Sequence, residues 1–442
     1  MTKLLRITLI LLLLIIFPNI ANSLTSSTYL ITNAAVSSFD YETASKYFTN
    51  QDYSNLDIIE QDKKIISFIN SNKLEEANST AKHLITSENN NEDAWLVLLI
   101  YAKLNNDLKT FNNFETLKNK KDFTIIDHVF YKNGQLKKSN EEVAKRLYNL
   151  VQEIDLSSLN YPINIDYSLF YLNLSLSLKP NFNEVLFFQA QIYQELKHYF
   201  KAEEIYNKIQ PQHILYIEAQ KNIIINKKNA KKFDEAKKKL IQLINVYPNN
   251  ISLIVLLADI YRVNKQYEKA IQYYSLLIKK QNINYDKLWR IYYLRGISYE
   301  RSNKWRKAEN DFLQALEIEP QQPQVLNYLA YGWIEKDFHL EKSLNMLEMA
   351  VKKYPKNHYI LDSLAWAHYK KNNFFKAAEI MEKVIEIAPG EAISLDHLGD
   401  IYFSLGRKRE ASFMWAQALD LAESEDNISE AVKMKLDKYN AG

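Results

Sequence analysis

Few residues in this sequence have the types and spacing that chemistry requires. Cysteine is absent, which excludes thiol catalysis, thiolate metal sites and disulfides. The closest approach to a ligand cluster is Asp396-His397-x-x-Asp400, because its two carboxylates lie one helical turn apart. A metal ion would need further ligands from elsewhere, so we interpret this cluster as the solvated face of a helix. We predict no metal, no cofactor and no enzymatic activity.

The composition favours helices joined by short connections. Hydrophobic residues make up 47% and charged residues 25%, as in an ordinary folded protein. Only 7 glycines and 9 prolines occur in 442 residues. These are too few for the turns of a sandwich, a barrel or a doubly wound sheet, and the scattered glycines form no phosphate-binding loop. The expected fold is therefore all-α.

The net charge of +3 argues against nucleic acid as a partner, because phosphate binding needs a clustered basic surface. One basic run extends from Lys221 to Lys239. Contact with anionic lipid or polysaccharide is one interpretation of this run. We favour a polar helix surface, because the whole chain is rich in lysine.

The N-terminus has the layout of a secretory signal peptide. Lys3 and Arg6 precede the apolar run Ile7–Phe17, and small residues follow at Ala21 and Ser23. We predict a signal peptide over residues 1–23, cleavage after Ser23 and export across the inner membrane, so the protein would be periplasmic or envelope-associated. The alternative is an uncleaved anchor, which would be the chain's one contact with a membrane.

A column of small residues recurs along the chain. In each copy an alanine or serine stands three positions after an aromatic or other side chain, usually a large one, and successive copies are 34, 34, 38, 35, 34 and 34 residues apart. The members are Ala202, Ala236, Ala270, Ala308, Ser343, Ala377 and Ala411. Prolines recur with compatible spacing at positions 180, 248, 320, 355 and 389. A period of about 34 residues predicts helix-turn-helix units that stack into a solenoid.

The fuller pattern resembles the tetratricopeptide repeat (TPR) family over residues 184–423. Its clearest copy is Leu395-x₂-Leu398-Gly399-x₂-Tyr402…Ala411-x₃-Trp415. The resemblance implies an all-α, right-handed α-solenoid of antiparallel helix pairs, with about 10–12 repeats. Small residues are expected where paired helices approach, and Trp95, Trp333 and Trp415 are expected in the core.

Weaker copies of the signature extend the array toward the N-terminus. We predict divergent TPR-like repeats over residues 24–120, an irregular helical joint over 121–165 and the C-terminal array over 166–423. A capping helix and tail should follow over residues 424–442, because the open end of a solenoid needs a cover.

In this family the first helix of each repeat faces a concave groove, which the resemblance places on two rows of residues here. The groove would be aromatic in its middle and acidic toward the C-terminal end. Its expected members are Tyr293, Asn327, Tyr331, Asp362, Trp366, Asp396 and Asp400. Acidic and aromatic side chains do not suit the clamp that holds peptide carboxylates in some relatives. An extended protein segment carrying lysine or arginine fits better.

The expected function is thus a non-enzymatic scaffold that binds protein partners in the bacterial periplasm or cell envelope. The runs Asn327–Trp333, Leu361–Trp366 and Leu395–Asp400 resemble repeats of envelope TPR proteins from Gram-negative bacteria. Two alternatives stay open. Groove aromatics could bind a polysaccharide or peptidoglycan glycan, or the chain could be an accessory to a catalytic partner.

Overall fold

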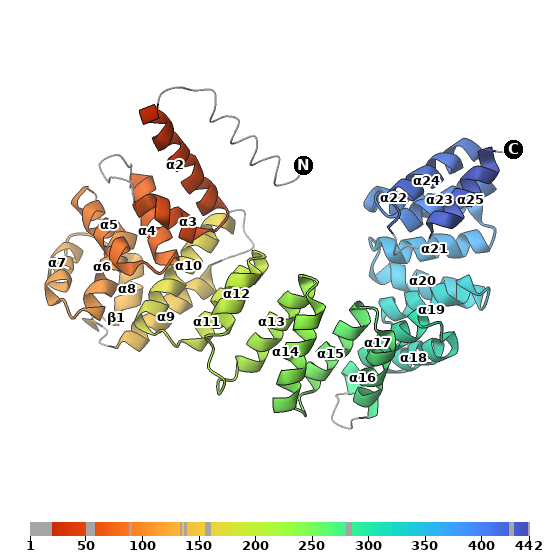
Figure 1. The fold of residues 1–442 in the computed structure, drawn as a ribbon, viewed down its shortest axis with the longest axis horizontal. Coiled ribbons are helices and arrows are strands. Elements are labelled where there is room, and N and C mark those ends of the chain that lie inside the picture. Colours follow the sequence, from red (N-terminus) through yellow and green to blue (C-terminus); the bar gives the residue numbers. More distant parts are fainter. Residues whose placement is uncertain are drawn as a thin grey trace. The chain divides into compact units, whose positions relative to one another are not determined.

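The computed structural model describes residues 20–49, 58–87, 91–132, 135–136, 139–154, 161–279, 285–423 and 428–440. Most of the predicted signal segment, residues 1–19, lies outside these ranges. The described chain is α-helical apart from one antiparallel pair of two-residue strands, which confirms the all-α prediction (Figure 1). It forms two compact units, Met1–Asn226 and Lys227–Gly442, here called unit 1 and unit 2.

The helices follow one another with short connections in both units. Those of unit 1 are α2 (Ile20–Ser37), α3 (Tyr41–Thr49), α4 (Ile58–Asn70), α5 (Leu74–Ser87), α6 (Glu92–Leu104), α7 (Leu108–Lys118), α8 (Thr124–Phe130), α9 (Asn140–Glu153), α10 (Tyr161–Leu178), α11 (Asn183–Glu195) and α12 (Tyr199–Tyr206). The strands β1 (Tyr131–Lys132) and β2 (Gln135–Leu136) lie between α8 and α9. Helix α13 (Tyr216–Asn229) contains the boundary between the units.

Unit 2 continues the alternation of first and second helices. Its members are α14 (Phe233–Val246), α15 (Ile251–Val263), α16 (Tyr267–Lys279), α17 (Tyr285–Arg301), α18 (Trp305–Ile318), α19 (Pro323–Glu335), α20 (Leu340–Lys353), α21 (His358–Lys370), α22 (Phe374–Ile387), α23 (Ala392–Ser404), α24 (Lys408–Leu421) and α25 (Ser429–Asn440). From α15 onward each first helix packs against its own second helix, and each second helix packs against the next first helix. Helix α25 follows the last pair and packs against α24.

Ten turns in the described residues join a first helix to its second helix in the same way. At least one residue in each turn has a left-handed backbone, as Lys231 (φ 59°), Asn303 (φ 57°) and Gly406 (φ 77°) do. The next residue donates its N–H to the carbonyl five positions earlier, for example Arg407 to Tyr402 at 2.9 Å. This bond satisfies a carbonyl that the helix end leaves free. Asparagine and lysine occupy most of these left-handed positions, so the turns form with few glycines.

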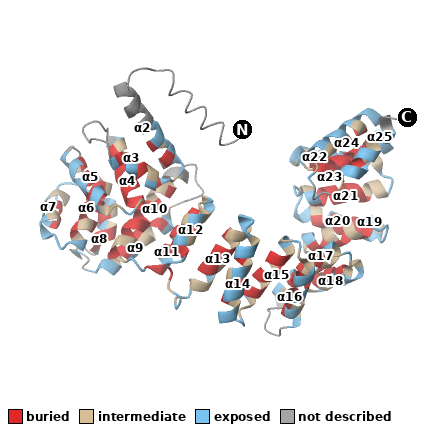
Figure 2. Cartoon of the chain, in the orientation of Figure 1, coloured by how far each residue is buried: buried red, intermediate tan, exposed pale blue. Residues whose placement is uncertain are grey.

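The recurring small residues lie where paired helices touch. Ala202, Ala270, Ala377 and Ala411 are fully buried, as the sequence predicts. Gly399 of α23 lies against α24, since a Cβ there would be 2.4 Å from the Trp415 ring. Buried residues follow the facing sides of the helix pairs (Figure 2). The core tryptophans Trp95, Trp333 and Trp415 are 6%, 2% and 4% exposed, which confirms their expected burial.

Unit 1 contains a helix that lies across the first helices of its repeats. Helix α10 packs against α4 and α6 as well as its chain neighbours α9 and α11. Ile165, Leu169 and Leu172 are buried in it. The sequence places Tyr161-Pro162 in an irregular joint, but the structure begins α10 at Tyr161, because proline is accepted in the first turn of a helix.

Polar bonds fix α10 to the repeats that it covers. The Tyr41 hydroxyl donates to the Asp166 carboxylate, and the Asn70 Nδ2 donates to the Asp166 carbonyl at 3.2 Å. The Asn173 Nδ2 donates to the Asn70 Oδ1 at 3.1 Å. The chain itself therefore fills the face that first helices present in unit 1. The expected joint over residues 121–165 lies within this unit, and the boundary between units falls at Asn226 and Lys227.

Within the described residues, no helix combines the length and the apolar character needed to cross a membrane.

Candidate functional site

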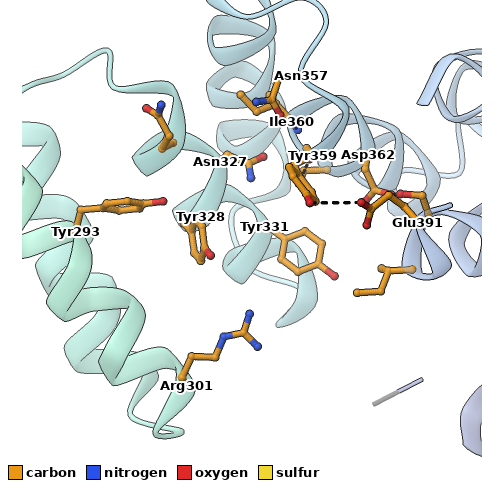
Figure 3. A pocket seen from close by; sticks show the side chains of 14 residues that line it. Tyr293, Arg301, Asn327, Tyr328, Tyr331, Asn357, Tyr359, Ile360, Asp362 and Glu391 are labelled. Atoms are coloured by element: carbon orange, nitrogen blue, oxygen red, sulfur yellow. Dashed lines mark hydrogen bonds between the residues drawn. The ribbon is translucent and has the colours of Figure 1, made fainter. Parts of the chain in front are cut away.

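Four first helices of unit 2 form a groove with a cavity volume of about 420 Å³ (Figure 3). Its walls come from α17, α19, α21 and α23, together with the residues just before α21 and α23. The lining consists of Tyr293, Arg301, Gln324, Asn327, Tyr328, Tyr331, Asn357, Tyr359, Ile360, Asp362, Ser363, Glu391, Ile393 and Ser394.

Local sequence signals start the helices that carry these side chains. Helix α19 begins with Pro323, whose fixed φ suits the first helical position. Helix α21 is capped by Asn357, whose side-chain oxygen accepts the N–H of Ile360 at 3.1 Å. Such starts set the rotation of each helix, and therefore the residues that it turns toward the groove.

The structure brings four of the seven predicted groove residues into this cavity. Tyr293, Asn327, Tyr331 and Asp362 all line it. The other three, Trp366, Asp396 and Asp400, do not line it, and each contacts groups of the protein itself.

Trp366 is buried rather than offered to a ligand, with 8% of its surface exposed. Its ring stacks between those of Tyr369 and His397, with centroids 4.5 Å and 4.1 Å away. Its Nε1 donates to the Glu335 Oε1 at 2.7 Å. The expectation of an exposed aromatic floor at Trp366 is therefore corrected, because the next repeat covers this ring.

Asp362 lies at the edge of the groove but is held by helix α23. Its Oδ2 accepts the Ser394 hydroxyl at 2.7 Å, and its Oδ1 lies 3.1 Å from the Nδ1 of His397. Burial alone would lower the pKa of His397, but the Asp362 carboxylate outweighs burial, and Asp396 and Asp400 add to its effect, so the pKa is raised. The expected solvated face around His397 is thus a buried, charge-paired contact.

Asp396 and Asp400 form a site for a lysine of the same chain. The Lys435 ammonium of α25 donates to the Asp396 Oδ1 at 2.6 Å and to the Asp400 Oδ2 at 2.8 Å. Burial would lower the pKa of Lys435, but these two hydrogen bonds raise it. The two aspartates are therefore not a free acidic wall, because α25 already supplies a cation.

The open groove is rich in tyrosine hydroxyl groups. Burial raises the pKa of Tyr293, Tyr331 and Tyr359 above the ordinary value, so their hydroxyls stay protonated at neutral pH and can donate hydrogen bonds. The Tyr359 hydroxyl donates to the Glu391 Oε1 at 3.4 Å (Figure 3). Tyr293 and Tyr328 pack edge to face, with centroids 5.5 Å apart. The middle of the groove thus offers ring faces and phenol donors.

Asn327 carries the clearest sign of an unmet contact. Its Oδ1 is buried, and in the described part of the chain it has no hydrogen-bond partner. A buried acceptor without a donor is costly, at about 1–3 kcal/mol. Asn327 also lines the groove, so its side-chain amide lies beside any segment that binds there.

Sequence reasoning missed Arg301, Tyr359 and Glu391. Arg301 stands two turns after Tyr293, and Tyr359 stands one turn before Asp362, so both lie on helix faces that the prediction had already assigned to the groove. Following each face along its helix would have found them. Glu391 precedes α23, and only the packing of α23 beside α21 brings it into the groove.

Outside the groove, other charged clusters are occupied by ion pairs. In the basic run, Lys227 lies 3.0 Å from Glu235 and Lys237 lies 2.7 Å from Asp234. Among the residues that the structure describes, no group of three or more histidine, aspartate or glutamate side chains has a geometry that could hold a metal ion.

Two segments of the chain match sequence profiles described as tetratricopeptide repeat, at residues 251–279 and 289–322. A curated relative is a TPR repeat-containing protein of Pseudomonas aeruginosa. It is 25% identical over 172 residues, which are 39% of this chain and 28% of the relative. The match therefore spans less than a third of that protein's length.

Solved structures that match this chain include a tetratricopeptide repeat protein from Parabacteroides merdae and the yeast protein Tom70. The first is 18% identical, with a TM-score of 0.46 over 59% of this chain and 99% of the other. The second is 12% identical, with a TM-score of 0.42 over 94% of this chain and 96% of the other.

Proposed function

Because this chain is a tetratricopeptide repeat protein, we propose that it is a scaffold that binds a protein partner through the groove of unit 2. The partner would lay an extended segment along α17, α19, α21 and α23. The scaffold contributes binding and positioning, and catalysis is not part of its role.

One observation carries this proposal: the groove in unit 2 is open and has an unmet acceptor, Asn327 Oδ1. An extended peptide presents backbone N–H groups along its length, and one of them would bond to this atom once the Asn327 amide turns toward the groove. Unit 1 gives an internal comparison, because its own helix α10 covers α4 and α6 there. The face of unit 2 is thus better suited to a partner from outside the chain.

We place this activity in the periplasm or at the cell envelope. The support is the N-terminal layout, in which Lys3 and Arg6 precede an apolar run and small residues follow it. The absence of cysteine fits any compartment and does not bear on this placement.

Site-specific photocross-linking in the producing cell tests the proposal. A photoreactive amino acid replaces Tyr359, which is 59% exposed and lines the groove. The matched control replaces Phe375 of α22, which is 85% exposed and does not line the groove. We expect a protein adduct from position 359 that is absent from position 375.

A further variant connects the adduct to the groove. In the presence of Asn327→Ala, which removes the unmet acceptor, the adduct at position 359 should weaken. Adducts of equal yield at both positions, or none at either, would overturn the proposal. A glycan adduct at position 359 would instead support the carbohydrate alternative, since tyrosine faces and carboxylates also suit sugars.

A further inference from the structure

We propose that the groove binds its peptide in one fixed direction, with an acidic residue facing Arg301 and a basic residue facing Glu391. This inference rests on the proposed function and adds the charge pattern of the partner. The two charged side chains come from opposite ends of the groove, since Arg301 ends α17 and Glu391 precedes α23.

The cationic end is available to a ligand. The Arg301 side chain is 56% exposed and points toward the cavity (Figure 3). Its Nε lies 3.4 Å from the Glu300 Oε2, and among the described residues this is its one ion pair. The two Nη atoms therefore keep their donors for a carboxylate, which guanidinium groups bind well.

The anionic end is also available. The Glu391 side chain is 41% exposed, and it accepts a long hydrogen bond from the Tyr359 hydroxyl at 3.4 Å. The Nε2 of His358 lies 3.7 Å from the Glu391 Oε1. Asp362 adds negative charge near Tyr331, although Ser394 and His397 already hold its oxygens.

Between the two ends the groove is uncharged and aromatic. Tyr293, Tyr328 and Tyr331 line this part together with the amides of Gln324 and Asn327. Tyrosine rings pack against apolar side chains, and amides bond to a peptide backbone without regard to its sequence. The charges at the ends therefore distinguish one direction of a peptide from the reverse.

Selection from a random peptide library displayed on phage tests this inference with the full chain. We expect the enriched peptides to carry an acidic and a basic residue in one constant order, separated by apolar residues. Arg301→Gln should abolish the enrichment of the acidic residue alone, and Glu391→Gln that of the basic residue alone. Matched controls are Arg306→Gln and Glu386→Gln, because both residues are exposed on second helices. The controls should select the wild-type pattern.

Affinity measurements then couple each pair. For a labelled peptide from the selection, replacing its acidic residue by the amide should weaken binding about 2- to 5-fold to the wild-type chain, the usual effect of an exposed ion pair. The same replacement in the peptide should not change its affinity for the Arg301→Gln variant. The difference should shrink as salt is added.

The outcomes separate the two proposals. Enriched peptides with no constant charge order, or with an order that survives both substitutions, would overturn the direction while leaving groove binding intact. A selection that enriches no peptide, together with no adduct at position 359, would overturn both.

Discussion

The indole ring of Trp366 stacks on the imidazole of His397, with centroids 4.1 Å apart and planes inclined by 15°. Trp366 belongs to α21 and His397 to α23, so the stack joins the first helices of two successive repeats. The indole Nε1 also bonds to Glu335 of α19. A residue expected to meet a ligand therefore ties three repeats together.

Trp366→Ala should destabilise the chain strongly. Removing a buried tryptophan typically costs about 3–5 kcal/mol, through lost burial and the cavity left behind. Chemical denaturation followed by circular dichroism measures the change. Phe375→Ala is the control, because that ring is 85% exposed, and its denaturation midpoint should stay close to that of the wild type. Equal midpoints for the two variants would mean that the packing of Trp366 does not stabilise the fold.

The stability of the fold should fall as the pH rises, because the contact between His397 and Asp362 loses its charge pairing. The folded pKa of His397 lies above its ordinary value of 6.5, because the nearby carboxylates outweigh burial. Its contribution is therefore complete below 6.5 and is lost as the pH rises through the folded pKa. Denaturation midpoints across this range should fall in the wild type.

The same series with His397→Gln should show a smaller fall. His213→Gln, in unit 1, is the control and should keep the wild-type slope. A wild-type slope in His397→Gln would assign the pH dependence to another group, such as Asp93, whose pKa burial raises to about 7.

Gly399→Ala tests the contact between α23 and α24. A Cβ at this position would lie 2.4 Å from the Trp415 Cδ1, and the indole is held by a 3.1 Å bond from its Nε1 to Asp400. Overpacking of this kind costs about 1–3 kcal/mol, more than the helix gains by replacing glycine. Gly390→Ala has nothing within 4 Å of the new Cβ and should change stability by less than about 0.5 kcal/mol. A stabilised Gly399→Ala variant would refute the tight packing.

Lys435→Met should loosen helix α25. Val432 is the one buried side chain among those described in this helix, so the bonds of Lys435 to Asp396 and Asp400 make up much of its attachment. We expect amide hydrogen exchange in α25 to rise about tenfold, equivalent to about 1.4 kcal/mol. Lys438→Met, at an exposed position of the same helix, should leave exchange unchanged. Unchanged exchange in both variants would show that apolar contacts suffice.

The mature protein is expected to begin at Leu24. Ala21 and Ser23 are the small residues that precede the cleavage site, and the structure begins α2 at Ile20, so cleavage would remove its first four residues. Mass spectrometry of the purified protein from a periplasmic extract measures the N-terminus. Recovery of a chain that starts at Met1 in the membrane fraction would indicate an anchor instead.

The sequence determined the repeat architecture of this protein through local and periodic signals. Small residues such as Ala377 and Gly399 recur at fixed spacing because each repeat must bring two helices into contact at the same point. Their burial needs no knowledge of other repeats, since the contact lies within one helix pair. For the same reason the core position of Trp415, which packs against Gly399 of its own pair, could be predicted from a single unit.

Only the tertiary structure decided which groove residues are available. Trp366, Asp396 and Asp400 occupy groove-facing rows in the sequence, but their surroundings come from the next repeat or from α25. The distance along the chain from Asp396 to Lys435 has no periodic signal, so this pairing could not be predicted. In the same way, α10 covers α4 and α6 of unit 1, and its contact with α4 joins residues as far apart as Asn70 and Asn173. A helix face can be assigned from spacing, whereas its exposure depends on which distant segment packs against it.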